Sequence, residues 1–312
     1  MSRKILYFIV IIAALAIQDI NSQNSQVLYY MNLPQNHLLN PAIRPTNTFY
    51  LGLPGISGVN VNISNNFFNF SDIFSLDSEG DSTISVFNPD YDISKFIDKI
   101  KDLNTIEPQA AVQLFGLGFN AGRDLYVFLD VNERVEMDFA IPGDMLRLLF
   151  EGNEQFTGDR IDLNSLTTGI SWYREAGLGF SKNITNRLRI GIRGKILFGM
   201  VNASLENKGL AVTINEDYTH KIEADLMANI SAPVEFTMNE ENIIEDVTYD
   251  EARFEESSEI VNYLLRTGNP GLGLDIGAEY SISDRFRLSA SVTDLGYIKW
   301  KQDLTNLKSK NQ

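Results

Sequence analysis

The stretch that decides the fold runs from Arg187 to Met200 and reads RLRIGIRGKILFGM. Its even positions are apolar apart from Gly194, and its odd positions up to 195 carry four positive charges: Arg187, Arg189, Arg193 and Lys195. Successive side chains of a β-strand point to opposite faces, so the stretch predicts a strand with one apolar and one charged face. The stretch is longer than the strands of soluble proteins, which usually have about 5–6 residues. Its length suits a tilted membrane strand, which needs about 9–11 residues.

The same alternation recurs along the chain. It is clearest in residues 125–139, 222–230, 271–280 and 285–293. Further candidate strands are residues 49–53, 59–64, 111–120, 172–182 and 209–218. The pattern predicts an all-β protein of about ten strands.

The polar faces of these strands contain both signs of charge. Asp275 and Glu279 lie one short turn before Arg285 and Arg287, so we expect cross-strand pairs in a barrel lumen. The alternative is the solvated sheet face of a soluble β-sandwich.

The predicted connections alternate between tight and long. Residues 121–123, 182–186 and 281–284 are short hairpin turns, whereas 65–110, 141–170 and 231–269 are long loops. Outer-membrane barrels show this alternation. The loops contain two amphipathic patterns, at 93–103 and 143–152, which predict short helices. The acidic stretch 235–260 lacks the spacing of a calcium loop and is interpreted as a solvated outer loop.

The N-terminus has the pattern of a secretory signal peptide over residues 1–22. A basic start precedes the apolar run Ile5–Ile17, whose helical length of about 20 Å is less than a bilayer core of about 30 Å. Cleavage is expected near Ser22, and an uncleaved helical anchor is the alternative. The sequence therefore predicts an exported protein, which would enter a membrane only as a closed barrel.

The composition argues against several functional classes. Lys and Arg number 26 against 41 Asp and Glu, and the formal charge of −15 disfavours nucleic-acid binding. There is no cysteine, and the only histidines are His37 and His220, so no thiolate or His-rich metal site is expected. The sequence has no Gly-x-Ser-x-Gly elbow, no P-loop and no dinucleotide loop of the right spacing, so no cofactor or catalytic nucleophile is expected. We therefore expect a protein that is not an enzyme.

Several motifs carry a family resemblance. They are LYYMNLPQ at 28–35, LNPA at 39–42, FYLGLP at 49–54, GLGFS at 177–181 and TDLGYIKW at 293–300. Together they resemble an uncharacterised Bacteroidota family of exported outer-membrane β-barrels. The Asn40-Pro41-Ala42 step is similar to an element near the N-terminus of FadL-type fatty-acid channels and of PorV-type barrels of the type IX secretion system. By itself, Asn-Pro is also a common turn opener.

The resemblance implies an antiparallel transmembrane β-barrel of the FadL type, with about fourteen strands. Residues 23–48 would form an N-terminal plug carrying Asn40, Pro41 and Ala42, and residues 49–312 the barrel domain. The chain stops before the last strands of the family pattern, so we expect either a truncated barrel or one that closes with fewer strands.

The expected function is transport of hydrophobic or small solutes across the outer membrane. The candidate lumen residues are Arg187, Arg189, Arg193, Lys195, Arg287, Asp275 and Glu279. Their cations would either favour anionic solutes or pair with carboxylates across the wall. One alternative is a non-transporting outer-membrane scaffold that binds secretion-system proteins. The other is a soluble exported β-protein that binds a ligand. Outer-membrane lipid and hydrophobic small molecules are the expected partners.

Overall fold

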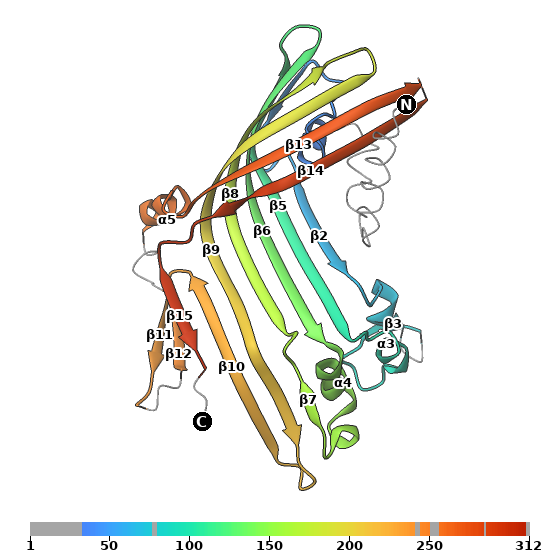
Figure 1. Ribbon diagram of the computed structural model, residues 1–312, viewed down its shortest axis with the longest axis vertical. Helices are drawn as coiled ribbons and strands as arrows, with labels where there is room; N and C mark the ends of the chain where they lie inside the picture. The colour runs from blue at the N-terminus through green and yellow to red at the C-terminus, as the bar shows by residue number, and fades with distance from the viewer. Residues whose placement is uncertain (1–32, 77–79, 241–243, 250–255, 284, 310–312) are drawn as a thin grey trace, which may run out of the picture.

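The computed structural model describes residues 33–76, 80–240, 244–249, 256–283 and 285–309. An eleven-stranded, antiparallel sheet dominates the molecule (Figure 1), which confirms the all-β prediction. The predicted signal peptide, residues 1–22, lies outside the described residues, as do residues 23–32 of the predicted plug.

Most strands of the large sheet are long. They are β1 (Phe49–Gly52), β2 (Val59–Asn65), β5 (Leu103–Asn120), β6 (Leu125–Pro142), β7 (Arg160–Asp162), β8 (Thr167–Asn183), β9 (Leu188–Ile214), β10 (His220–Ser231), β13 (Pro270–Ser283), β14 (Phe286–Ile298) and β15 (Leu304–Lys308). Two small hairpins are formed by β3 (Phe74–Leu76) with β4 (Thr83–Ser85) and by β11 (Val234–Met238) with β12 (Ile244–Tyr249).

Short helices occupy the connections. They are η1 (Pro34–Leu38), η2 (Phe70–Asp72), α3 (Ser94–Ile97), α4 (Gly143–Glu151), η3 (Glu154–Phe156) and α5 (Ser257–Leu264). The helix expected at 143–152 is thus present as α4. The helix expected over 93–103 is shorter than predicted, because Leu103 already belongs to β5. Among the described residues, no helix is long and apolar enough to cross a membrane.

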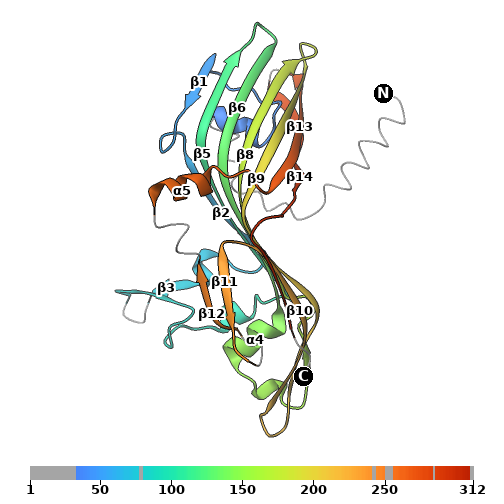
Figure 2. The same ribbon diagram turned by 90° about the vertical axis from the view of Figure 1, so that its left-hand side faces the viewer.

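Strand β9 organises the sheet. It has 27 residues and joins the predicted strands 187–200 and 209–218 into one. One edge of β9 pairs mainly with β8, whereas the other pairs first with β13 over Leu188–Phe198 and then with β10 over Asn202–Ile214. The sheet therefore forks into two lobes. The upper lobe contains β1, β13, β14 and the neighbouring parts of β5, β6, β8 and β9, and it ends in β14 (Figure 1). The lower lobe contains β2, β7, β10, β15 and the remaining parts of the long strands, and it ends in β15 (Figure 1). Figure 2 shows the sheet edge-on between the two lobes, where its strands twist from one lobe into the other.

A buried asparagine holds the fork together. Asn269 is fully buried, and its Oδ1 accepts hydrogen bonds from the backbone N–H groups of Lys301 (2.7 Å) and Gln302 (3.0 Å). Its backbone oxygen accepts a 2.8 Å hydrogen bond from the N–H of Gly199, in the middle of β9. Trp300 packs directly over Gly199, where a larger side chain would collide with the indole. The chain therefore passes from the upper to the lower lobe at a fixed point.

The outer face of the upper lobe is apolar from edge to edge. Register partners form continuous rows on this face, and one row reads Leu51, Leu117, Leu129, Leu178, Gly194, Leu274 and Leu295. Leu178 is 60% exposed and Leu295 is 52% exposed. The opposite, inner face buries charge, with Arg193 and Asp275 each 1% exposed. This distribution is the reverse of that in most soluble proteins, whose charged side chains are mostly exposed and whose interiors are mostly apolar.

The lower lobe covers its outer face with loop elements. Ile106 and Ile141 pack against a cluster that contains Phe67, Phe96 and Leu146. A second cluster places Leu148 of α4 and Phe156 of η3 against Ile214 and neighbouring apolar residues. The lower lobe thus has a conventional hydrophobic core, and the uncovered apolar surface belongs mainly to the upper lobe.

The described sheet is open. Strands β1 and β2 form one edge by pairing with β5, and β14 and β15 end the other edge of the two lobes. No strand within the described ranges pairs with the outer edge of β14 or of β15. The expected closed barrel is therefore not found in this part of the chain.

We predict that Asn269→Ala destabilises the fork. Removing a buried side chain that bonds two backbone N–H groups should cost about 1–3 kcal/mol of unfolding free energy. Urea unfolding followed by tryptophan fluorescence measures this, since Trp300 lies beside the fork. Asn186→Ala, in the exposed turn before β9, is the matched control. Equal stability of the two variants would contradict the prediction.

Candidate functional site

Residues 33–45, here called the inner segment, cross the inner face of the upper lobe. At one end, Gln35 Nε2 donates to Tyr50 Oη of β1 (3.0 Å) and to Gln113 Oε1 of β5 (3.1 Å). At the other end, Ser291 Oγ of β14 donates to the backbone oxygen of Leu39 (2.7 Å). The segment therefore connects the two edge regions of the lobe, and η1 lies behind β13 in Figure 1.

The Asn40-Pro41-Ala42 step is the most deeply buried part of the inner segment. Asn40 and Ala42 are both fully buried. Asn40 Nδ2 donates to Ser289 Oγ of β14 (2.7 Å), while its Oδ1 accepts the N–H of Ala42 (2.8 Å). The second bond forms a local turn of the kind that Asn-Pro sequences favour. The step is thus both a turn and a contact to the last strand of the lobe.

Two strand glycines make room for this step. A side chain at Gly191 of β9 would collide with the backbone of Pro41, and one at Gly277 of β13 would collide with Asn40. Glycine inside a strand often marks the close approach of another backbone. These two glycines therefore fix where the inner segment contacts the sheet.

His37 connects the inner segment to the charged residues of the sheet. Its Nδ1 lies 2.8 Å from the backbone oxygen of Pro34, and its Nε2 lies 3.0 Å from Asp130 Oδ2. The ring also packs against Phe128, with centroids 4.3 Å apart. His37 is 3% exposed, so this polar contact is buried.

Arg193 forms the centre of a buried ion-pair cluster. Its guanidinium binds Asp130 through Nε (3.0 Å) and Nη2, Glu175 through Nη2 (2.7 Å) and Asp275 through Nη1 (2.9 Å). These carboxylates come from β6, β8 and β13, so one side chain of β9 joins four strands. All four side chains are at most 2% exposed.

Lys195 and Arg134 extend the cluster toward β14. Lys195 Nζ lies 2.6 Å from Asp275 Oδ1 and 2.5 Å from Asp294 Oδ1. Arg134 binds Asp294 (2.9 Å), Glu136 (2.7 Å) and Glu175 (3.4 Å). The cluster thus contains three cations, Arg134, Arg193 and Lys195, and five carboxylates, Asp130, Glu136, Glu175, Asp275 and Asp294.

A β-bulge brings Asp294 into the cluster. Asp294 has a positive φ of 60°, and the β13–β14 register shifts between Leu274 and Ile276. The backbone N–H of Asp294 donates to Asp275 Oδ1 (2.7 Å), which fixes the bulge. Such bulges re-aim side chains. Here the extra residue keeps Leu295 in the apolar outer row while the Asp294 carboxylate reaches Lys195.

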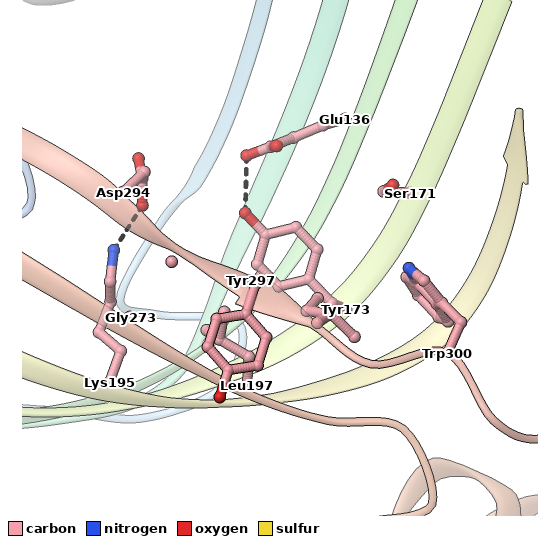
Figure 3. A pocket seen from close by; sticks show the side chains of 11 residues that line it. Glu136, Ser171, Tyr173, Lys195, Leu197, Gly273, Asp294, Tyr297 and Trp300 are labelled. Carbon is pink, nitrogen blue, oxygen red and sulfur yellow. Dashed lines mark hydrogen bonds and ion pairs between the residues drawn. The ribbon is translucent and has the colours of Figure 1, made fainter.

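Two cavities adjoin the cluster. The larger, of about 590 Å³, lies between the inner segment, β5 and β14, and includes Asn132, Arg134 and Ser291 in its wall. The smaller, of about 250 Å³, is lined by Tyr173, Tyr297 and Trp300 among others (Figure 3). Glu136 and Asp294 contribute to the walls of both cavities. The inner face therefore keeps polar space beside its paired charges.

The predicted lumen residues separate into two groups. Arg193, Lys195 and Asp275 join the cluster, whereas Arg189 and Glu279 form their own pair (3.2 Å). Arg287 is largely exposed and lies 3.9 Å from Glu279, so Asp275 and Glu279 pair mainly with β9 and not with Arg285 and Arg287 as expected. Arg187 is exposed in the turn before β9. Arg189, Arg193 and Lys195 are thus each paired with a carboxylate.

Several site residues were not singled out from the sequence. Asp130, Arg134 and Glu136 belong to the polar row of the predicted strand 125–139, and Glu175 lies within the strand 172–182. The alternation of polar and apolar residues places them on one face of each strand. The sequence does not show the register between strands that brings them to Arg193. His220 is remote from the cluster and lies 3.3 Å from Asn153. Among the described residues, no group of His, Asp and Glu is arranged to hold a metal ion.

Comparisons with known proteins give one match. Residues 41–312 match the model described as "Family of unknown function (DUF5723)". No curated protein matches the chain, and no solved structure matches it.

We predict that Arg193→Met strongly destabilises the upper lobe. The variant leaves three buried carboxylates without their shared cation, which should cost about 3–5 kcal/mol of unfolding free energy. Arg193→Lys should lie between the variant and the wild type, because lysine keeps the charge but loses the planar fork.

Arg187→Met is the matched control for chemical denaturation, since Arg187 is exposed and should change the unfolding free energy by less than about 0.5 kcal/mol. If Arg193→Met were as stable as this control, the cluster would not be a stabilising element.

Proposed function

We propose, for a chain that belongs to the DUF5723 family of unknown function, that its sheet forms part of the wall of an outer-membrane β-barrel whose inner face lines a passage for small solutes. The observation that carries this proposal is the reversed distribution of polarity. The upper lobe exposes apolar rows on its outer face and buries paired charges on its inner face.

A lipid environment accounts for the outer face. Seven strands of the upper lobe present contiguous apolar rows, and exposed examples are Leu51, Leu178 and Leu272. An apolar surface of this extent would be unusual on a soluble monomer. In hydrocarbon it carries no penalty, and the backbone between the strands is already hydrogen-bonded, as a bilayer requires.

The height of the apolar surface fits a bilayer. On β8 the outer row is bounded by Lys182 above and by Arg174 below, where Arg174 pairs with Glu133. The eight residue steps from Arg174 to Lys182 span about 27 Å at about 3.4 Å per residue. A tilt of about 40° reduces this to about 21 Å, comparable with the apolar band of about 25 Å in outer-membrane barrels.

The unpaired edges of β1 and β14 would be the places where the sheet joins the rest of the barrel wall. Unpaired strand edges are not tolerated in hydrocarbon, so the wall would be completed by further strands beside β14 and β1. The present sheet would then be one section of a larger barrel.

The inner segment would close the passage at rest. It contacts β1, β5, β6, β8, β9, β13 and β14, so it obstructs the inner face across the lobe. Transport would require its displacement. The same obstruction favours the second candidate, a non-transporting outer-membrane scaffold, and solute flux distinguishes the two.

We predict that Leu178→Arg impairs membrane insertion. A cation at the middle of the apolar surface should cost about 2–4 kcal/mol if it faces lipid, whereas a soluble protein would tolerate it. Insertion into liposomes and the boiling-dependent shift on a detergent gel measure this. Leu149→Arg, at a position 70% exposed on α4, is the matched control. Equal insertion of both variants would contradict a lipid-facing position for Leu178, and failure of the wild type to insert would favour the soluble β-protein.

We predict that Asn40→Ala increases solute flux. The substitution removes the hydrogen bonds that Asn40 Nδ2 donates to Ser289 and Ala290 of β14 and leaves the bond from Ser291 to Leu39, so the segment should leave the inner face more often. Liposome swelling with a small neutral sugar should become several-fold faster, while Asn186→Ala should match the wild type. Inserted protein that gives no flux in any of these forms would favour the scaffold.

A further inference from the structure

We infer that the passage favours small cationic solutes, such as those with an ammonium or guanidinium group, and that Glu136 and Asp294 set this preference. The inference rests on the proposed function and names the solute class for the same inner face. It differs from the anionic preference that the row of Arg and Lys residues on β9 would suggest.

The charges of the cluster are arranged in layers. The side chains of Arg193 and Lys195 are only 1% and 2% exposed. Three of the carboxylates that bind them, Asp130, Glu175 and Asp275, are at most 2% exposed. By contrast, Glu136 is 36% exposed and Asp294 is 47% exposed. A solute on the inner face would therefore meet carboxylates, with the cations lying beneath them.

The third cation, Arg134, does not make the exposed surface of the cluster positive. Arg134 is 21% exposed and lies in the wall of the larger cavity, but it binds Glu136, Glu175 and Asp294 at once. Its charge is thus more than matched by its own partners. With three cations against five carboxylates, the ionised cluster carries a net charge of −2 when His37 is neutral.

The two carboxylates lie where the cavities meet. Glu136 projects from β6 and Asp294 from β14, and both line both cavities. Figure 3 shows Glu136 above Tyr173 and Asp294 beside Lys195, on separate strands around the smaller cavity. A solute that passes from one cavity to the other would therefore pass both carboxylates.

The aromatic lining of the smaller cavity is an independent observation. Tyr173 and Trp300 contribute to its wall, and aromatic faces attract cations through the ring quadrupole. Tyr173 already has such a contact, with the Arg134 guanidinium 5.7 Å from the ring centroid. The larger cavity adds acceptor oxygens from Gln109, Asn132 and Ser291, which suit N–H donors.

The test is the reversal potential of the full chain in planar bilayers under a potassium chloride gradient. The Asn40→Ala background is used throughout so that the inner segment does not limit conduction. We expect potassium to be more permeant than chloride. Glu136→Gln and Asp294→Asn should each lower the permeability ratio by roughly sixteenfold, because one unit charge at about 5 Å in water favours the cation about fourfold and disfavours the anion about fourfold.

The matched control is Glu216→Gln, which makes the same change in the exposed turn between β9 and β10 and should leave the ratio unchanged. The effects at Glu136 and Asp294 should also shrink at 1 M salt, where the Debye length falls to about 3 Å. A chloride preference, or a ratio that neither substitution alters, would overturn the inference and leave the passage itself intact. A complete absence of conductance would overturn the proposed passage and the inference with it.

Discussion

The upper lobe depends on one constraint: charges buried on its inner face have to be paired. Arg193 meets it by binding carboxylates from β6, β8 and β13. Each of these strands must therefore keep its register, since a shift of one residue would exchange the inner and outer faces. The charge cluster and the apolar outer rows thus specify the same alignment from opposite sides of the sheet. The bulge at Asp294 extends this agreement to the last strand of the lobe.

The inner segment and the cluster form one polar core. His37 contacts Asp130, which also binds Arg193, so the segment is joined directly to the centre of the ion pairs. Glycines on β9 and β13 allow its backbone to lie directly against the sheet. The lower lobe is built differently, because its outer face packs against α4 and the neighbouring loops. The same sheet thus has a polar core on the inner face of its upper lobe and an apolar core on the outer face of its lower lobe.

The sequence allowed much of the fold to be predicted, because strict alternation is a local signal. The strands at 125–139, 271–280 and 285–293 are all present in the structure, with boundaries that differ by a few residues. The union of 187–200 and 209–218 into β9 was not predicted, because Asn202, Glu206 and Asn207 interrupt the apolar pattern there. Their contacts with neighbouring strands and loops, such as Asn207 with Leu163, stabilise the continuous strand. The partners of Arg193 could not be predicted either, because they depend on registers between distant segments.

The position of Asn40 has a consequence for the order of folding. Its side chain binds Ser289, which lies 249 residues later in the chain. The inner segment therefore cannot reach its final position until nearly all of the upper lobe has been synthesised and paired. Contacts of such long range make folding slow, because the entropy of closing the intervening loop is lost before they form. During this time the segment does not cover the inner face, and the charges that are buried in the folded protein are in contact with water. Docking of the segment would then be a late step, in which water leaves the ion pairs and the upper lobe becomes rigid.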